Sequence, residues 1–87
     1  MCQSENTRIA LIGIIVENNN ATERINALLH DCAAYVVGRM GVPYRQKSVS
    51  IISVVMDAPG DVISALAGRL GSLPGVSVKT VYAPSSK

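Results

Sequence analysis

The sequence contains no phenylalanine and no tryptophan, and Tyr35, Tyr44 and Tyr82 are its only aromatic residues. Even so, hydrophobic residues make up 48% of the chain, an ordinary share for a globular protein. A buried core must therefore be built almost entirely from isoleucine, valine, leucine, methionine and alanine.

Cysteine and excess charge are also scarce. Cys2 and Cys32 are too few for a disulfide framework. The net charge of +2 is too small to attract nucleic acid or a membrane by its field alone. No segment approaches the roughly 18 uncharged apolar residues of a membrane span, and residues 1–6 lack the features of a signal peptide. We therefore expect a cytoplasmic protein without direct nucleic-acid or membrane contacts.

One pattern occurs twice in the chain: an apolar strand that ends in an acid, then a helix, then a second strand. The first copy has strands at 7–16 and about 35–42, with a helix from about residue 21. The second has strands at 49–56 and 76–82, with a helix from about residue 61. Two such units predict an α+β, ferredoxin-like βαββαβ fold, with a four-stranded antiparallel sheet and two helices on one face. A single domain at 7–83 with flexible tails at 1–6 and 84–87 fits this length.

Several boundary signals accompany these elements. Asn20, with Glu23 three residues later, is typical of a helix N-cap with its capping-box partner. Gly38 and Gly41 interrupt the second strand and predict a bulge or a close backbone approach. Gly71 is a candidate for the left-handed C′ position just beyond the second helix.

Both faces of the two central strands are apolar, although two helices can cover only one face of a sheet. Burying even about 400 Å² of the second face would contribute on the order of 10 kcal/mol before association costs. We therefore expect a homo-oligomer, a dimer or tetramer, formed through the uncovered face or the edge strands. An exposed patch on a monomer is the alternative. The alternation alone does not assign either face to the helices.

Polar residues follow both apolar strands. We expect the strands at 7–16 and 49–56 to lie adjacent and parallel, so that the acids that follow them share one edge beside both helix N-termini. Carboxylates and amides there would suit a cation or a small amine-bearing ligand. The same residues also suit helix caps that complement the helix dipoles. The candidate ligand-binding residues are Glu17, Asn18, Asn19, Asn20, Asp57 and Asp61.

A basic cluster is expected at the connection between the second and third strands. Arg39, Tyr44 and Arg45 lie close together in the sequence, and arginine is suited to two-pronged contacts with carboxylate or phosphate. They are candidate contacts for an anion or a protein partner. Charged residues that protect a strand edge are the alternative explanation.

Several enzyme and metal-binding classes lack their required residues here. His30 and Cys32 fall on different sides of the first helix, so they cannot share one metal ion, and we expect no metal and no cofactor. The loop at 17–20 has neither the Cys-x-x-Cys of copper chaperones nor the arginine of acylphosphatases. No aromatic residue lies on the central strands, as base-stacking RNA-binding domains require. There is no Ser–His–Asp set or glycine-rich phosphate loop either, so we expect a protein that is not an enzyme.

Three segments resemble a known family. The stretches 37–45 (VGRMGVPYR), 50–61 (SIISVVMDAPGD) and 76–80 (VSVKT) closely resemble the small proteins named as regulators of the iron-only hydrogenase system. The resemblance covers nearly the whole chain between its tails. It implies an ACT-like domain related to the C-terminal domain of the nickel-responsive repressor, with a small effector bound at subunit interfaces near the first strand–helix loop, here Glu17 to Asn20.

Two departures limit what the resemblance implies. The nickel repressor needs several histidines and a cysteine as ligands, whereas this chain has only His30, so nickel binding is not implied. The repressor also carries a ribbon-helix-helix segment, for which we expect no counterpart here. The resemblance thus implies a regulatory module that senses a small ligand or binds a protein partner. The alternative is a ligand-free scaffold or assembly factor for a hydrogenase-related protein.

Overall fold

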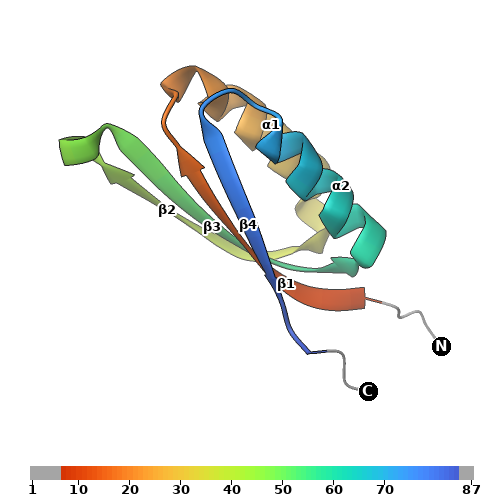
Figure 1. Ribbon diagram of the computed structural model, residues 1–87. Coiled ribbons are helices and arrows are strands. Elements are labelled where there is room, and N and C mark those ends of the chain that lie inside the picture. Colours follow the sequence, from red (N-terminus) through yellow and green to blue (C-terminus); the bar gives the residue numbers. More distant parts are fainter. Residues whose placement is uncertain (1–6, 85–87) are drawn as a thin grey trace.

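The computed structural model describes residues 7–84 as one four-stranded sheet with two helices packed on one face (Figure 1). The elements, in chain order, are β1 (Thr7–Val16), η1 (Asn19–Ala21), α1 (Thr22–Asp31), η2 (Ala33–Tyr35), β2 (Val36–Tyr44), η3 (Arg45–Lys47), β3 (Val49–Pro59), α2 (Gly60–Gly71) and β4 (Val76–Tyr82). This arrangement confirms the predicted ferredoxin-like α+β fold. Of the expected tails, residues 1–6 and 85–87 lie outside the described residues. Within residues 7–84, no helix is long and apolar enough to cross a membrane.

The strand order is β2-β3-β1-β4, and all three neighbouring pairs are antiparallel. β1 and β3 are adjacent, as expected, but the expectation that they run parallel is wrong: Ile9 pairs with Asp57, and Val16 pairs with Ser50. The connectivity gives the reason. The crossover through α1 returns β2 to the direction of β1, and the β2–β3 hairpin then reverses the chain, so β3 must oppose β1.

The core lies between the helices and the even-numbered residues of the central strands. Ile12, Ile14, Val54 and Met56 are all fully buried there. They pack with Ile25, Leu29, Ile63, Leu66 and Leu70 of the two helices. Every buried side chain in the described part of the chain is aliphatic or a methionine, which confirms the predicted composition of the core. Each such side chain contributes roughly 1.5–3 kcal/mol on burial.

β2 contains a β-bulge, as Gly38 and Gly41 predicted. Val36 pairs with Met56, but Gly38 already pairs with Val55, so Val37 is an extra residue in the strand. The side-chain alternation is therefore shifted by one position beyond the bulge. Arg39 consequently pairs with the fully buried Val54 and points to the helix side. The next residues alternate from there, and Met40, Val42 and Tyr44 point to the uncovered face.

The turn before β4 depends on Gly75. Its φ of +74° lies in the left-handed region, and a Cβ built on it would lie 2.7 Å from the Cβ of Asn18. Gly71 instead is the last residue of α2, and the right-handed Ser72 follows it, so the prediction that Gly71 takes the left-handed position beyond the helix is wrong. The left-handed conformation is needed three residues later, where the chain passes the loop after β1.

We predict that Gly75→Ala destabilises the domain by about 2 kcal/mol or more, because an alanine there meets both left-handed strain and a clash. The matched control is Gly68→Ala in the middle of α2, where a new Cβ has nothing within 4 Å. That change should stabilise the domain by up to about 1 kcal/mol through helix propensity. Urea unfolding followed by circular dichroism measures both. Equal effects of the two variants would contradict this account of the turn.

Candidate functional site

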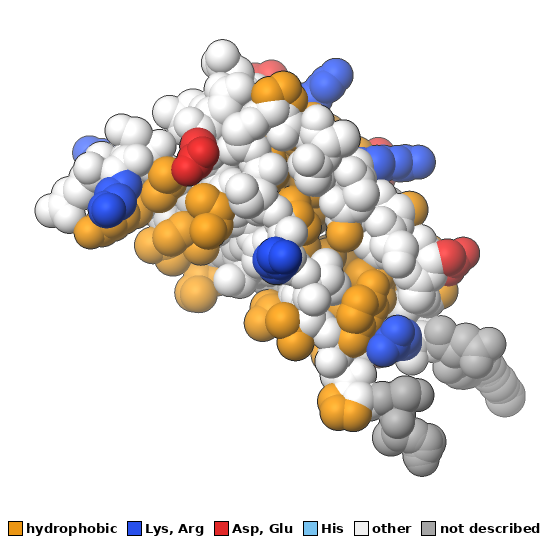
Figure 2. Space-filling view, viewed as in Figure 1, with side chains coloured by type: hydrophobic (Ala, Val, Ile, Leu, Met, Phe, Trp, Pro, Cys, Tyr) orange, Lys and Arg blue, Asp and Glu red, His pale blue; other side chains and the backbone are white. Residues whose placement is uncertain are grey.

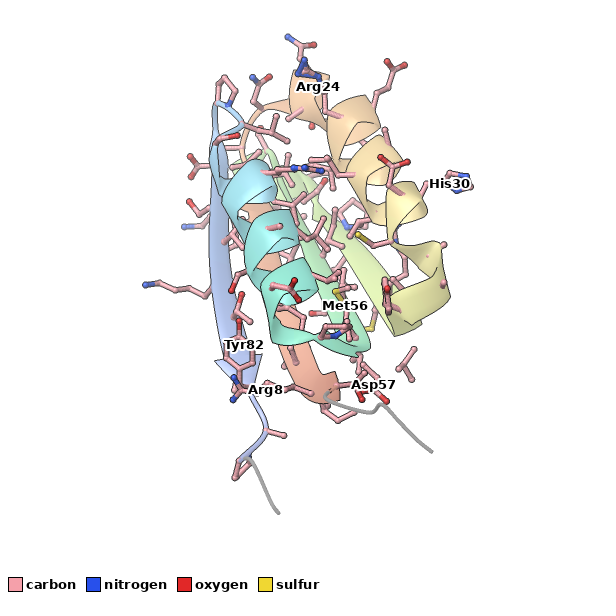
Figure 3. All side chains as sticks on the ribbon, turned by 90° about the vertical axis from the view of Figure 1, so that its right-hand side faces the viewer. Arg8, Arg24, His30, Met56, Asp57 and Tyr82 are labelled. Atoms are coloured by element: carbon pink, nitrogen blue, oxygen red, sulfur yellow. The ribbon has the colours of Figure 1, made fainter. Side chains whose placement is uncertain are left out.

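The two acids expected to share one edge lie at opposite ends of the sheet. Glu17 follows β1 at the end where β3 begins, whereas Asp57 pairs with Ile9 near the start of β1. In Figure 3, Asp57 lies beside Arg8 and Tyr82 at one end of the molecule, and Arg24 of α1 lies at the other. The predicted ligand set is therefore split by the antiparallel pairing of β1 and β3. It forms no single site.

The loop from Glu17 to Asn20 is held by hydrogen bonds that order the backbone. The backbone N–H of Glu17 donates to the carbonyl of Gly75 at 2.7 Å. The Oδ1 of Asn18 accepts from the backbone N–H of Asn20 at 3.0 Å, so Asn18 caps the short turn η1. The predicted cap at Asn20 is wrong because this turn precedes α1, whose own N-cap is Ala21 with no side-chain bond. Asn19 and Asn20 remain exposed.

Asn18→Ala should lower the free energy of unfolding by about 1 kcal/mol, the usual cost of losing an N-cap side chain. The neighbouring change Asn19→Ala is the control, since Asn19 is exposed. It should alter stability by less than about 0.5 kcal/mol. Thermal and urea unfolding of the three proteins tests the assignment. A larger loss from Asn19→Ala than from Asn18→Ala would show that the cap is elsewhere.

The opposite end of the sheet contains Asp57 and Asp61. Asp61 lies in the first turn of α2, and its Oδ1 accepts from the N–H of Val62 at 3.0 Å. Nearby, the guanidinium of Arg8 stacks over the ring of Tyr82, 4.2 Å from its centre. An acid in the first turn of a helix complements the helix dipole. The position of Asp61 is thus explained by the helix terminus alone, which favours the capping interpretation for this residue.

The expected basic cluster is also divided, because its members point to opposite faces of β2. The Nη2 of Arg39 donates to the Oδ1 of Asn26 on α1 at 3.1 Å. Tyr44 lies on the other face, and its O–H donates to the Oε1 of Gln46 at 2.8 Å. Arg45 belongs to the turn η3 beyond the strand. Arg39 therefore does not act together with Tyr44 and Arg45.

The face of the sheet turned away from the helices is apolar and uncovered. Figure 2 shows hydrophobic side chains gathered along the side opposite the helices, at the lower left. We call this the open face; its exposed large apolar residues are Ile9, Leu11, Ile15, Met40, Val42, Tyr44, Ile51 and Val81. The register arranges them in rows. Ile15 lies between Ile51 and Ser77, and Leu11 lies between Val55 and Val81.

A hollow on the helix side of the sheet was missed by the sequence reasoning. It has a volume of about 340 Å³ and lies between α1 and β2, lined by Asn26, Leu29, His30, Ala33, Val36, Arg39 and Val54. The Arg39–Asn26 hydrogen bond crosses it. The signal that could have indicated it is the predicted bulge, because only the shifted alternation puts Arg39 on the same side as α1.

The described residues offer little for metal binding. Among residues 7–84, no group of three or more histidine, cysteine, aspartate or glutamate side chains is placed to hold a metal ion. Cys32 is a free thiol that is half buried against the core. The His30 ring projects outward from α1 (Figure 3).

The fold and its surfaces define a small α+β module whose sheet has one covered and one open apolar face. The sequence model of the TM1266-like family, described as "Iron-only hydrogenase system regulator, putative", matches residues 8–80. The chain belongs to this family. No match is found among curated proteins.

Solved structures with the same fold are similar to this chain. Uncharacterized protein TM1266 from Thermotoga maritima is 35% identical with a TM-score of 0.86, covering 90% of this chain and 99% of that one. The C-terminal domain of the MgtC protein from Mycobacterium tuberculosis is 15% identical, with a TM-score of 0.71 and 93% of each chain covered. A formyltetrahydrofolate deformylase from Pseudomonas putida KT2440 is 20% identical with a TM-score of 0.63, over 87% of this chain and 29% of that one. The last two likenesses show the fold alone.

Proposed function

We propose that this protein is a homo-oligomeric, ACT-like regulatory module of the iron-only hydrogenase system that acts through a small effector or a protein partner, without catalysis and without reading DNA itself. Membership of the regulator family supports the biological setting. The weak net charge of +2 supports a role without direct DNA contact, because it gives little attraction to phosphate.

The observation that carries the proposal is the open face. Two of its side chains, Met40 and Val81, are 62% and 63% exposed, and those of the central strands are close to half exposed. They come from all four strands, in rows such as Val42–Ile51–Ile15 and Val55–Leu11–Val81, whereas the apolar residues of a monomer surface are usually scattered. A second copy placed on this face would exclude water from the open faces of both copies. This is the simplest way for so small a domain to bury more apolar area.

The loop from Glu17 to Asn20 is the proposed effector contact within this assembly. Glu17 directly follows β1, at the end of the odd-numbered series that forms the open face, and its side chain is exposed. A subunit stacked on that face would therefore lie close to this loop. The backbone bond between Glu17 and Gly75 fixes the loop in place, so its exposed amide and carboxylate groups are held ready for a ligand.

Leu11→Lys should convert the oligomer to a folded monomer, because it places a charge in the middle of the open face. Size-exclusion chromatography with light scattering measures the mass. Ser64→Lys on the exposed side of α2 is the matched control and should leave the mass unchanged. Ile14→Lys should instead unfold the domain, since Ile14 is fully buried under the helices. A wild-type protein that is monomeric at high micromolar concentration would overturn the oligomer proposal.

In a host with an iron-only hydrogenase, loss of this protein should change hydrogenase transcript or activity levels. Genes that encode the wild type or Ser64→Lys should restore them, whereas Leu11→Lys and Glu17→Ala should not. Transcript measurement and a hydrogen-evolution assay provide the readouts. Restoration by Glu17→Ala would exclude the loop as effector contact and favour a ligand-free scaffold. Unchanged hydrogenase levels in the deletion strain would contradict the regulatory role itself.

A further inference from the structure

The hollow between α1 and β2 is not used by the proposed function. It lies on the helix side of the sheet, so contacts across the open face would not cover it. Its floor is apolar and consists of Leu29, Val36 and Val54, of which Leu29 and Val54 are buried. Asn26 from the helix and Arg39 from the strand provide its polar groups, which are hydrogen-bonded to each other. An apolar floor with a few convergent polar groups is the usual composition of a small-molecule site.

The bulge in β2 is what brings a cation to this hollow. In a regular strand that continued from Val36, residue 39 would point to the open face. The extra residue Val37 shifts the alternation, so that Arg39 is opposite Val54 and points beneath α1. Gly38 and Gly41 have no side chains, and nothing lies within 4 Å of the Cβ positions they lack. Gly41 pairs with the buried Ile52 and so lies on the same face as Arg39, which leaves open space beside the arginine at that position.

Arg39 has donors left for a ligand. Its guanidinium uses one N–H for Asn26 at 3.1 Å, and the planar group carries several more. This bond restrains the arginine side chain before a ligand arrives, which lowers the entropy lost on binding. The amide of Asn26 accepts with Oδ1, so its own NH₂ is available as a further donor beside the guanidinium. Together they match the two oxygens of a carboxylate.

We propose that this hollow binds a small carboxylate with a short branched aliphatic chain. The carboxylate would be held by Arg39 and Asn26, and the aliphatic chain would lie against Val36 and Ala33, above the buried Leu29 and Val54. A volume of about 340 Å³ is at the small end of ligand pockets and has room for a small carboxylate of this kind. Inorganic phosphate would leave the apolar floor uncovered. An amino acid would bring an ammonium group for which the lining residues provide no carboxylate.

The test uses isovalerate as the probe in a titration of the ¹⁵N-labelled full chain. Saturable shifts are expected at the amides of Leu29, Val36 and Arg39. Three further probes separate the contributions: isoamyl alcohol lacks the charge, phosphate lacks the aliphatic chain, and leucine adds the ammonium. Each should bind more weakly than isovalerate. Equal or tighter binding of any of the three would overturn the proposed ligand class, and no saturable shift with isovalerate would overturn the site.

Variants then test the role of the arginine. Arg39→Gln should weaken isovalerate binding about tenfold or more, the loss expected for hydrogen bonds to a charged group. Arg39→Lys keeps the positive charge but loses the forked geometry of the guanidinium. Its affinity for isovalerate should therefore lie between those of the wild type and Arg39→Gln. Arg45→Gln, in the exposed turn η3, is the matched control and should bind as the wild type does. Arg39 and Asn26 are both exposed, so Asn26→Ala provides a second variant that should retain the fold and also bind more weakly. Unchanged affinity in Arg39→Gln would contradict the proposal.

Discussion

One extra residue in the edge strand β2 determines which β2 side chains lie on each face of the sheet. The bulge at Val37 shifts the side-chain alternation of β2 against β3. Because side chains in a strand alternate with a period of two, a shift of one position transfers every later residue to the other face. It moves Met40 and Val42 to the open face and Arg39 beneath α1. The β2 part of the open face and the position of Arg39 in the hollow thus both result from the bulge.

Only two helices are available to cover the four-stranded sheet, and they cover one of its faces. Two helices bury only the even-numbered rows of the central strands, and the resulting core is aliphatic and free of buried polar side chains among residues 7–84. The odd-numbered positions are also largely apolar but have no cover within the described chain. In a domain of this size the core provides little excess stability. Surface that remains uncovered in a single copy is therefore available to stabilise an assembly.

The sequence predicted the fold and the core composition, because strand–helix–strand periodicity and the lack of Phe and Trp are visible in it directly. It also indicated the bulge through Gly38. The direction of β3 relative to β1 was predicted wrongly, and this error placed Glu17 and Asp57 together. The hydrogen-bond partner of Arg39 was not predictable from spacing, because a shift of one residue in β2 reverses the face on which Arg39 lies. The partner of Asn18 was not predictable either, because the short turn η1 before α1 moves the cap from Asn20 to Asn18.

The structure also favours one surface over another for association. β2 is an edge strand, and a second copy could in principle extend the sheet there through backbone hydrogen bonds. That edge is interrupted by the bulge near its start and by Pro43 near its end, which has no N–H to donate. The open face has no backbone interruption of this kind: it carries apolar residues from all four strands, and one row of Met40, Ser53, Gly13 and Lys79 lies between the rows that contain Ile15 and Leu11. Stacking of open faces would thus bury more apolar area than pairing through the β2 edge, at a smaller cost in unsatisfied backbone groups.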